Sequence, residues 1–155
     1  MVLPFHKNGL GEQAHDPAGA ARGWRAAFLF RGPKPCDPEC AWLMENSVII
    51  INRHGMGQAD DTLSRKLVQS YLNMLDLGNQ LPRAICFYAE GVKLTAEGSH
   101  VLEELRSLAA KGVRLIACTT CLNHYQLLDD LRVGTAGSMQ DIVNAQAAAE
   151  KVITI

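Results

Sequence analysis

Two cysteines in the second half of the chain are the residues best suited to chemistry. Cys118 and Cys121 form a Cys-Thr-Thr-Cys motif after the apolar run 112–117 and before the amphipathic stretch 122–131. The first thiol is therefore predicted where a strand is followed by a helix, and there backbone N–H groups and the helix dipole favour a thiolate. If the helix begins near Thr119, the spacing of three places both sulfurs on one face. We expect Cys118 to be the nucleophile and Cys121 to resolve an adduct on it as a disulfide.

Other interpretations of the thiols stay open at this point. The pair could pack as small apolar residues, since free cysteine is often buried, or serve a thioredoxin-type redox role. Cys36 and Cys40 form a second pair that could complete a zinc site of four thiolates, but the loop-rich composition around them argues against it. We therefore expect neither a metal nor a cofactor. Cys86 alternates within an apolar run and is predicted to lie in the core.

Two loops carry side chains suited to an anionic sulfur substrate. The loop 52–58 contains two glycines, whose exposed N–H groups suit an anion. Cationic side chains there and in the loop 89–98 would stabilise a thiolate if these loops meet Cys118; solvated surface side chains are the alternative. The predicted substrate-binding residues are Arg53, His54, Lys93, Thr119 and Thr120.

An alternation of strand and helix patterns must position these residues. The β-branched run 47–52 is typical of a strand buried on both faces, and the segment from Asp60 to Gly78 has a helical period. Its predicted core face consists of Leu63, Leu67, Tyr71, Met74 and Leu75. Further strands are predicted at 83–88, 113–117 and 152–155, and further helices at 99–111, 122–131 and 139–150. This order predicts an α/β fold with a mostly parallel sheet, helices on both faces and ligand chemistry beyond the carboxyl ends of the strands.

Composition limits the remaining function classes. The chain has 155 residues, a net charge of −1 and no dense basic block or long apolar span, so we expect neither a nucleic-acid nor a membrane partner. The odd number of cysteines, 5, and the absence of an export signal predict free thiols in the cytoplasm. Residues 1–43 contain five of the 6 prolines and are predicted to be a poorly ordered or loop-rich extension. Residues 44–155 are predicted to form the folded domain.

Motifs spread over residues 46–155 resemble those of the DsrE/DsrF-like family, and most closely the C-terminal domain of YedF-type proteins. The matching segments are Gly55-Met-Gly57, Phe87 to Leu94, Glu97-Gly-Ser99, Gly112-Val113, Cys118 to Leu122 and Val133-Gly134. The resemblance implies a three-layer flavodoxin-like fold, homo-oligomers that are commonly trimeric or hexameric, and cytoplasmic sulfur handling. It also implies that Cys118 is the persulfide carrier.

The chain departs from the YedF-type pattern at its beginning. Those proteins usually start with a small SirA/TusA-like domain bearing a Cys-Pro-x-Pro motif, and Pro35-Cys-Asp-Pro38 is only a faint echo of it in a segment too short for that domain. A separate TusA-like protein is therefore the expected sulfur donor, and the selenium-related role of YedF-type proteins is less well supported. The leading hypothesis is a persulfide sulfur carrier or sulfurtransferase-like protein. The alternative is a non-catalytic oligomeric module that binds a small ligand or a partner.

Overall fold

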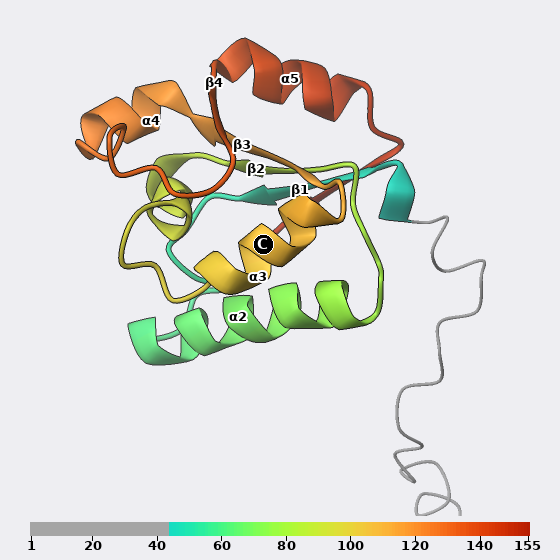
Figure 1. Cartoon of the computed structure of the whole chain (residues 1–155), viewed down its shortest axis with the longest axis horizontal. Helices are drawn as coiled ribbons and strands as arrows, with labels where there is room; N and C mark the ends of the chain where they lie inside the picture. The colour runs from blue at the N-terminus through green and yellow to red at the C-terminus, as the bar shows by residue number, and fades with distance from the viewer. Residues whose placement is uncertain (1–43) are drawn as a thin grey trace, which may run out of the picture. The chain divides into compact units, whose positions relative to one another are not determined.

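Five parallel strands form one sheet at the centre of the computed structural model, which describes residues 44–155. The strands are β1 (Ser47–Ile51), β2 (Ala84–Phe87), β3 (Arg114–Cys118), β4 (Thr135–Gly137) and β5 (Lys151–Thr154). Their order across the sheet is β4-β3-β2-β1-β5, and every neighbouring pair is parallel (Figure 1). The predicted α/β fold with a parallel sheet is confirmed. The extension 1–43 and its cysteines lie outside the described residues, so predictions about them remain predictions.

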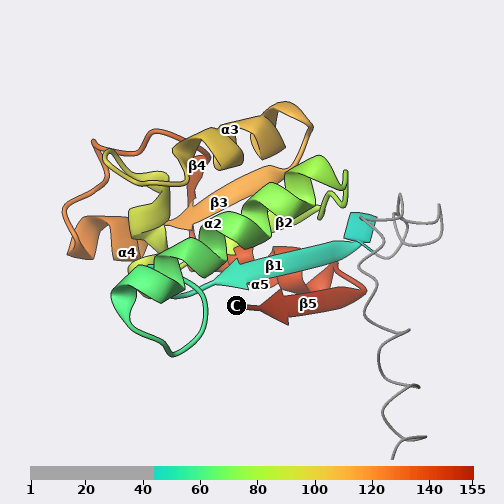
Figure 2. The same cartoon turned by 90° about the horizontal axis from the view of Figure 1, so that it is seen from below.

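Helices cover both faces of this sheet, and short helices follow the carboxyl ends of two of its strands. Helices α2 (Asp61–Leu77) and α3 (Leu102–Ala110) lie on one face, and α5 (Met139–Ala147) lies on the other (Figure 1). Right-handed crossovers explain this division. The chain runs across the sheet in one direction from β1 to β4, and it then runs back in the opposite direction to β5, so the last helix lies on the other face. The 3-10 helix η1 (Ala89–Thr95) and the short helix α4 (Thr119–His124) follow β2 and β3 directly. Figure 2 shows the strand arrows pointing towards the edge at which α4 lies.

The core lies on both sides of the central strands. Every residue of β1 and β2 is buried, and Cys86 is fully buried among them, as the sequence predicted. Such strands are nearly uniform in hydrophobicity because both faces are covered by helices. No helix within residues 44–155 is long and apolar enough to cross a membrane.

The predicted core face of α2 was largely wrong. Its buried residues are Ser64, Val68, Leu72 and Leu75, whereas Leu63, Leu67 and Met74 are exposed. The reason lies in the loop before the helix, where Gly55 packs so closely that a Cβ added to it would lie 2.7 Å from the Ser64 Cβ. The Ser64 carbonyl also accepts a hydrogen bond from the Met56 N–H at 2.9 Å. A small polar residue therefore occupies a core position that hydrophobic periodicity assigns to a larger side chain.

The helix predicted over 122–131 was also wrong, because the structure places α4 at Thr119–His124. Gln126 has a positive φ of 56°, and the Leu127 N–H turns back to the Leu122 carbonyl at 2.8 Å. This left-handed residue ends the helix after fewer than two turns. The strand β4 and the helix η1 were not predicted at all.

Candidate functional site

Strand register brings the two predicted loops of the site together. In the parallel pair β2 and β3, Phe87 lies opposite Ala117. The residues that follow, Ala89 at the start of η1 and Cys118 at the end of β3, therefore leave the sheet side by side at its carboxyl edge. Binding sites of open parallel sheets lie at this edge. The predicted position of the thiols at the junction of a strand and a helix is confirmed.

The two thiols differ in their access to solvent. Cys118 is the last residue of β3 and precedes the first residue of α4, and it is 0% exposed. Cys121, one helical turn later, is half-buried. Cys118 thus has the position predicted for a nucleophile but lacks the exposure that such a position usually provides.

A backbone N–H group is directed at the Cys121 sulfur. Ala89 donates its N–H to the Cys121 Sγ across 3.1 Å. Ala89 has a positive φ of 49°, which is uncommon for a residue with a Cβ. As the first residue of η1, it carries one of the N–H groups that find no acceptor within the helix itself. The sulfur of Cys121 serves as that acceptor. The hydrogen bond therefore links the positive φ of Ala89 to the position of the Cys121 thiol.

Several groups set the protonation of Cys121 in opposite directions. Burial raises the pKa of the Cys121 thiol above its ordinary value, and a hydrogen bond from the Ala89 N–H acts in the opposite direction. The Cys118 sulfur raises the pKa of Cys121 further, through a hydrogen bond and through its charge. The two sulfurs therefore interact, and the Cys118 sulfur disfavours deprotonation of Cys121.

Lys93 is the predicted cation that contacts the residue directly after the thiol helix. It extends from η1, where its Nζ pairs with the Glu90 Oε1 at 3.1 Å and lies 4.6 Å from the centroid of the Tyr125 ring. Tyr125 directly follows α4, the helix that carries Cys121. Lys93 thus links η1 to the end of α4 and places a positive charge beside the thiol helix.

The two threonines of the motif have different surroundings. The Thr119 Oγ1 donates a hydrogen bond to the Gly137 carbonyl at 3.0 Å, which ties the start of α4 to β4. Thr120 is exposed on α4. Thr119 therefore has a structural bond that the sequence did not predict, while a substrate contact by Thr120 remains a prediction.

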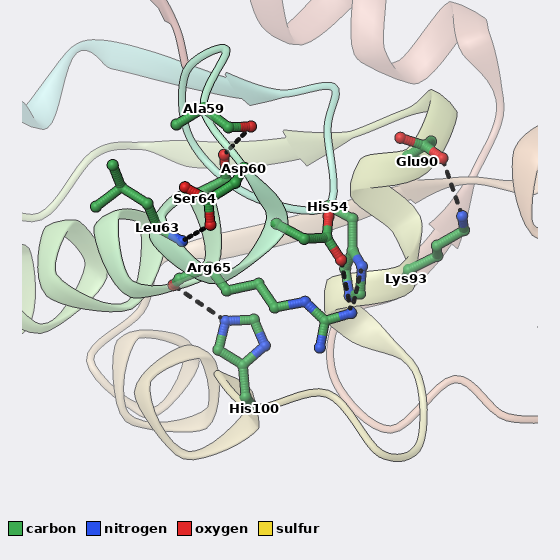
Figure 3. Close-up of polar contacts among 10 residues, drawn as sticks. His54, Ala59, Asp60, Leu63, Ser64, Arg65, Glu90, Lys93 and His100 are labelled. Atoms are coloured by element: carbon green, nitrogen blue, oxygen red, sulfur yellow. Dashed lines mark hydrogen bonds and ion pairs between the residues drawn. The ribbon is translucent and has the colours of Figure 1, made fainter.

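Arg53 makes a contact within its own loop. His54 contacts Arg65 of α2 (Figure 3). The Arg53 Nη1 lies 3.5 Å from the Gly57 carbonyl oxygen, and the His54 Nδ1 lies 3.3 Å from the Arg65 Nη2. His100 joins this group, because its Nε2 lies 3.2 Å from the Arg65 carbonyl oxygen. The sequence missed Arg65 and His100, since only the packing of α2 against the segment before α3 brings them to the loop.

The charges around His54 disfavour its protonation. Burial lowers the pKa of His54 below its ordinary value, and the positive charge of Arg65 lowers it further. His100 and Lys93 act in the same direction, whereas the Asp61 carboxylate raises it.

Two further features bear on other kinds of site. Within residues 44–155, no group of three or more His, Cys, Asp or Glu side chains is arranged to hold a metal ion. A groove of about 720 Å³ lies between α5 and the strands β3 and β4, and its lining includes Arg83, Arg114, Asp141 and Asn144. Neither Cys118 nor Cys121 lines this groove, so it is separate from the thiols.

The fold and the thiol pair define a parallel α/β protein with paired cysteines at the carboxyl edge of its sheet. The chain belongs to the DsrE/DsrF-like family, whose family model matches residues 46–155. No match to the chain is found among curated proteins.

Three solved structures share the fold. The YchN protein from E. coli is 20% identical, with a TM-score of 0.53 over 72% of this chain and 100% of its own. The protein of unknown function MTH1491 from Methanobacterium thermoautotrophicum is 24% identical, with a TM-score of 0.53 over 70% of this chain and 97% of its own. The conserved protein of unknown function BT1422 from Bacteroides thetaiotaomicron is 18% identical, with a TM-score of 0.51 over 71% of this chain and 95% of its own. At these identities the likeness concerns the fold, and the closer resemblance to YedF-type proteins remains a prediction.

Proposed function

We propose that this protein is a persulfide sulfur carrier, or sulfurtransferase-like protein, in which Cys118 is the sulfur acceptor. The observation that carries the proposal is the pair of interacting thiols at the carboxyl edge of the sheet, with the Ala89 N–H directed at the second sulfur. Membership of the DsrE/DsrF-like family supports it, because sulfur relay is the activity associated with that family.

The two thiols have distinct roles in this proposal. Cys118 holds the transferred sulfur as a persulfide, and its burial protects that reactive group from solvent. Cys121 is the resolving thiol: when its thiolate attacks the Cys118 Sγ, a disulfide forms between the two residues and the terminal sulfur leaves as sulfide. In that step the disulfide bond replaces the persulfide bond, so the Cys121 sulfur is oxidised, the carried sulfur is reduced and no outside oxidant is needed.

The partners and the surroundings of the thiols complete the proposal. A TusA-like protein would supply the sulfur, and the carrier would act as a trimer or hexamer in the cytoplasm. Lys93 would attract an anionic donor group, since it lies beside the helix that bears Cys121. Arg53, His54 and Thr120 would contribute to the same rim, with Arg65 and His100 adding to the charge around His54.

Intact-mass spectrometry of the full chain tests this proposal. The reduced protein is incubated with glutathione persulfide and freed from the reagent, and the wild type is expected to retain the mass of an added sulfur atom. The double variant Cys118→Ser/Cys121→Ser is expected to lose that addition. Cys86→Ala is the matched control, since Cys86 is fully buried and burial raises its pKa to about 11. Equal sulfur uptake by the double variant and the wild type would contradict the proposal.

The alternative function is a non-catalytic module that binds a small ligand or a partner. The observation that favours it is the groove beside α5, where Arg83 and Arg114 lie with Asp141 in a hollow of about 720 Å³ that contains no thiol. A wild-type protein that acquires no sulfur, and whose reactive thiol titrates near the ordinary value of about 8.5, would favour this function.

A further inference from the structure

The thiol that the proposed function makes the sulfur acceptor cannot be reached from outside. Cys118 is 0% exposed, and it is enclosed at the junction of β3 and α4. Thiol exchange requires the attacking sulfur to meet the sulfur atom that it attacks, so access is part of the rate. A protein-bound persulfide therefore cannot meet the Cys118 sulfur while β3 and α4 keep this arrangement.

Cys121 has the access that Cys118 lacks. It is half-buried rather than fully buried, and it lies one turn along α4, on the same side of the helix. Its sulfur also accepts the Ala89 N–H at 3.1 Å. Burial raises the pKa of Cys121, and a hydrogen bond of this kind opposes that rise because it favours the charged form of the group that accepts it.

The two thiols lie on the same side of the start of α4. Cys118 directly precedes the helix and Cys121 is its third residue, so a spacing of three residues brings their side chains to one face. The Cys118 sulfur also raises the pKa of Cys121, which is consistent with a short path between them.

We propose that sulfur reaches the buried Cys118 in two steps, with the half-buried Cys121 as the thiol that meets the donor. This inference rests on the proposed function and adds a path to it. The donor is a persulfide of the type R–S–SH, carried by a protein or by a small thiol.

Each step exchanges one sulfur–sulfur bond for another. In the first step, the Cys121 thiolate attacks the terminal sulfur of the donor, the new bond to Cys121 forms, and the donor leaves as a thiolate. In the second step, the Cys118 thiolate attacks the terminal sulfur now on Cys121, and Cys121 leaves as a thiolate. The proton of each attacking thiol passes to the thiolate that leaves, so neither step needs an oxidant or a reductant.

The order of labelling in the wild-type protein tests this path without any substitution. The full chain is mixed with glutathione persulfide, samples are alkylated with iodoacetamide over time, and the protein is digested with trypsin. Both thiols fall in the tryptic peptide 115–132, and fragment ions that separate at Thr119 and Thr120 show which sulfur is modified. Cys121 is expected to carry the sulfur first and Cys118 later. The peptide 84–93 with Cys86 is an internal control that should stay unmodified.

Single substitutions give a second, kinetic test. Cys121→Ser is expected to slow sulfur loading of Cys118 on the order of tenfold or more, because access limits the direct reaction. Cys118→Ser is expected to load Cys121 at about the wild-type initial rate, within roughly twofold. Asn123→Ser is the matched control, since Asn123 is exposed on the same helix and is expected to change neither rate.

The outcomes separate this inference from the proposed function. If Cys118 loads at the wild-type rate in Cys121→Ser, or before Cys121 in the wild type, the two-step path is overturned while the carrier function stands. If no form of the protein acquires sulfur, the carrier function itself is overturned.

Discussion

Replacing Gly91 by alanine is expected to disturb the site through the backbone. Gly91 lies in η1 directly against the end of β1, and a Cβ added there would lie 2.0 Å from the Ile51 carbonyl oxygen. That oxygen already accepts the Tyr88 N–H at 3.2 Å, so neither side can yield without moving β1 or η1. Overpacking typically costs about 1–3 kcal/mol, and a clash with backbone belongs at the upper end, about 3 kcal/mol.

Gly98→Ala is the matched control for this change. Gly98 has a positive φ of 80°, but no heavy atom lies within 4 Å of an added Cβ. Its cost is the left-handed backbone alone, about 1 kcal/mol, which corresponds to roughly 5 °C in melting temperature for a domain of this size. Gly91→Ala is expected to lower the melting temperature by more than about 10 °C on the same scale.

Two assays examine the Gly91 substitution. Thermal unfolding followed by circular dichroism measures the loss of stability, and the pH dependence of Cys121 alkylation measures the effect on the site. Since the Ala89 N–H lowers the pKa of Cys121, moving η1 should raise that pKa in Gly91→Ala and leave it unchanged in Gly98→Ala. Equal melting temperatures for the two variants would refute the reasoning, because the clash with Ile51 is what distinguishes them.

Two further expectations concern charged groups. The Asp76 carboxylate lies 2.8 Å from the Lys111 Nζ, and the hydrogen bond from Lys111 lowers the pKa of Asp76. The ionised carboxylate therefore stabilises the folded protein above the unfolded pKa of about 3.9. This stabilisation is lost as the pH falls through the lower pKa of the folded state. Asp76→Asn should therefore lose less stability below about pH 4 than the wild type does, as measured by urea unfolding at several pH values; an equal loss would contradict the assignment. Arg65→Met should raise the pKa of His54 towards its ordinary value, because the charge of Arg65 lowers it, and NMR titration of the His54 ring measures this. An unchanged His54 titration would show that burial alone sets its protonation.

Much of the fold could be predicted from the sequence because the strand signals are strong. The runs that became β1, β2 and β3 are continuous and apolar, which is what a parallel sheet covered on both faces requires. The strand β4 was missed because Thr135–Gly137 is too short and too exposed to show a pattern. The core face of α2 was missed because Ser64, a polar residue, faces Gly55 inside the core. Hydrophobic periodicity describes packing against side chains, whereas Ser64 packs against the backbone of Gly55, which has no side chain.

The candidate site was predictable as a motif but not as a geometry. The spacing of Cys118 and Cys121 indicated two thiols on one helix face, and the structure bears out a helix that starts at Thr119. Burial of Cys118 was one of two alternatives that the sequence left open, because it depends on how β3 and α4 are covered by the rest of the fold. The Ala89 N–H could not be predicted, because its direction follows from a positive φ at a residue that gives no sequence signal for one.

The chemistry of this site therefore depends on strand register as much as on the cysteines. Ala89 reaches Cys121 because Phe87 lies opposite Ala117, so that η1 and α4 begin side by side. If β3 shifted by one residue against β2, its side chains would change faces and the Ala89 N–H would no longer meet the Cys121 sulfur. The same two cysteines at the same spacing would then lack the backbone N–H that opposes the rise in the pKa of Cys121. The proposed two-step path therefore depends on the Ala89 N–H as well as on the spacing of the two cysteines.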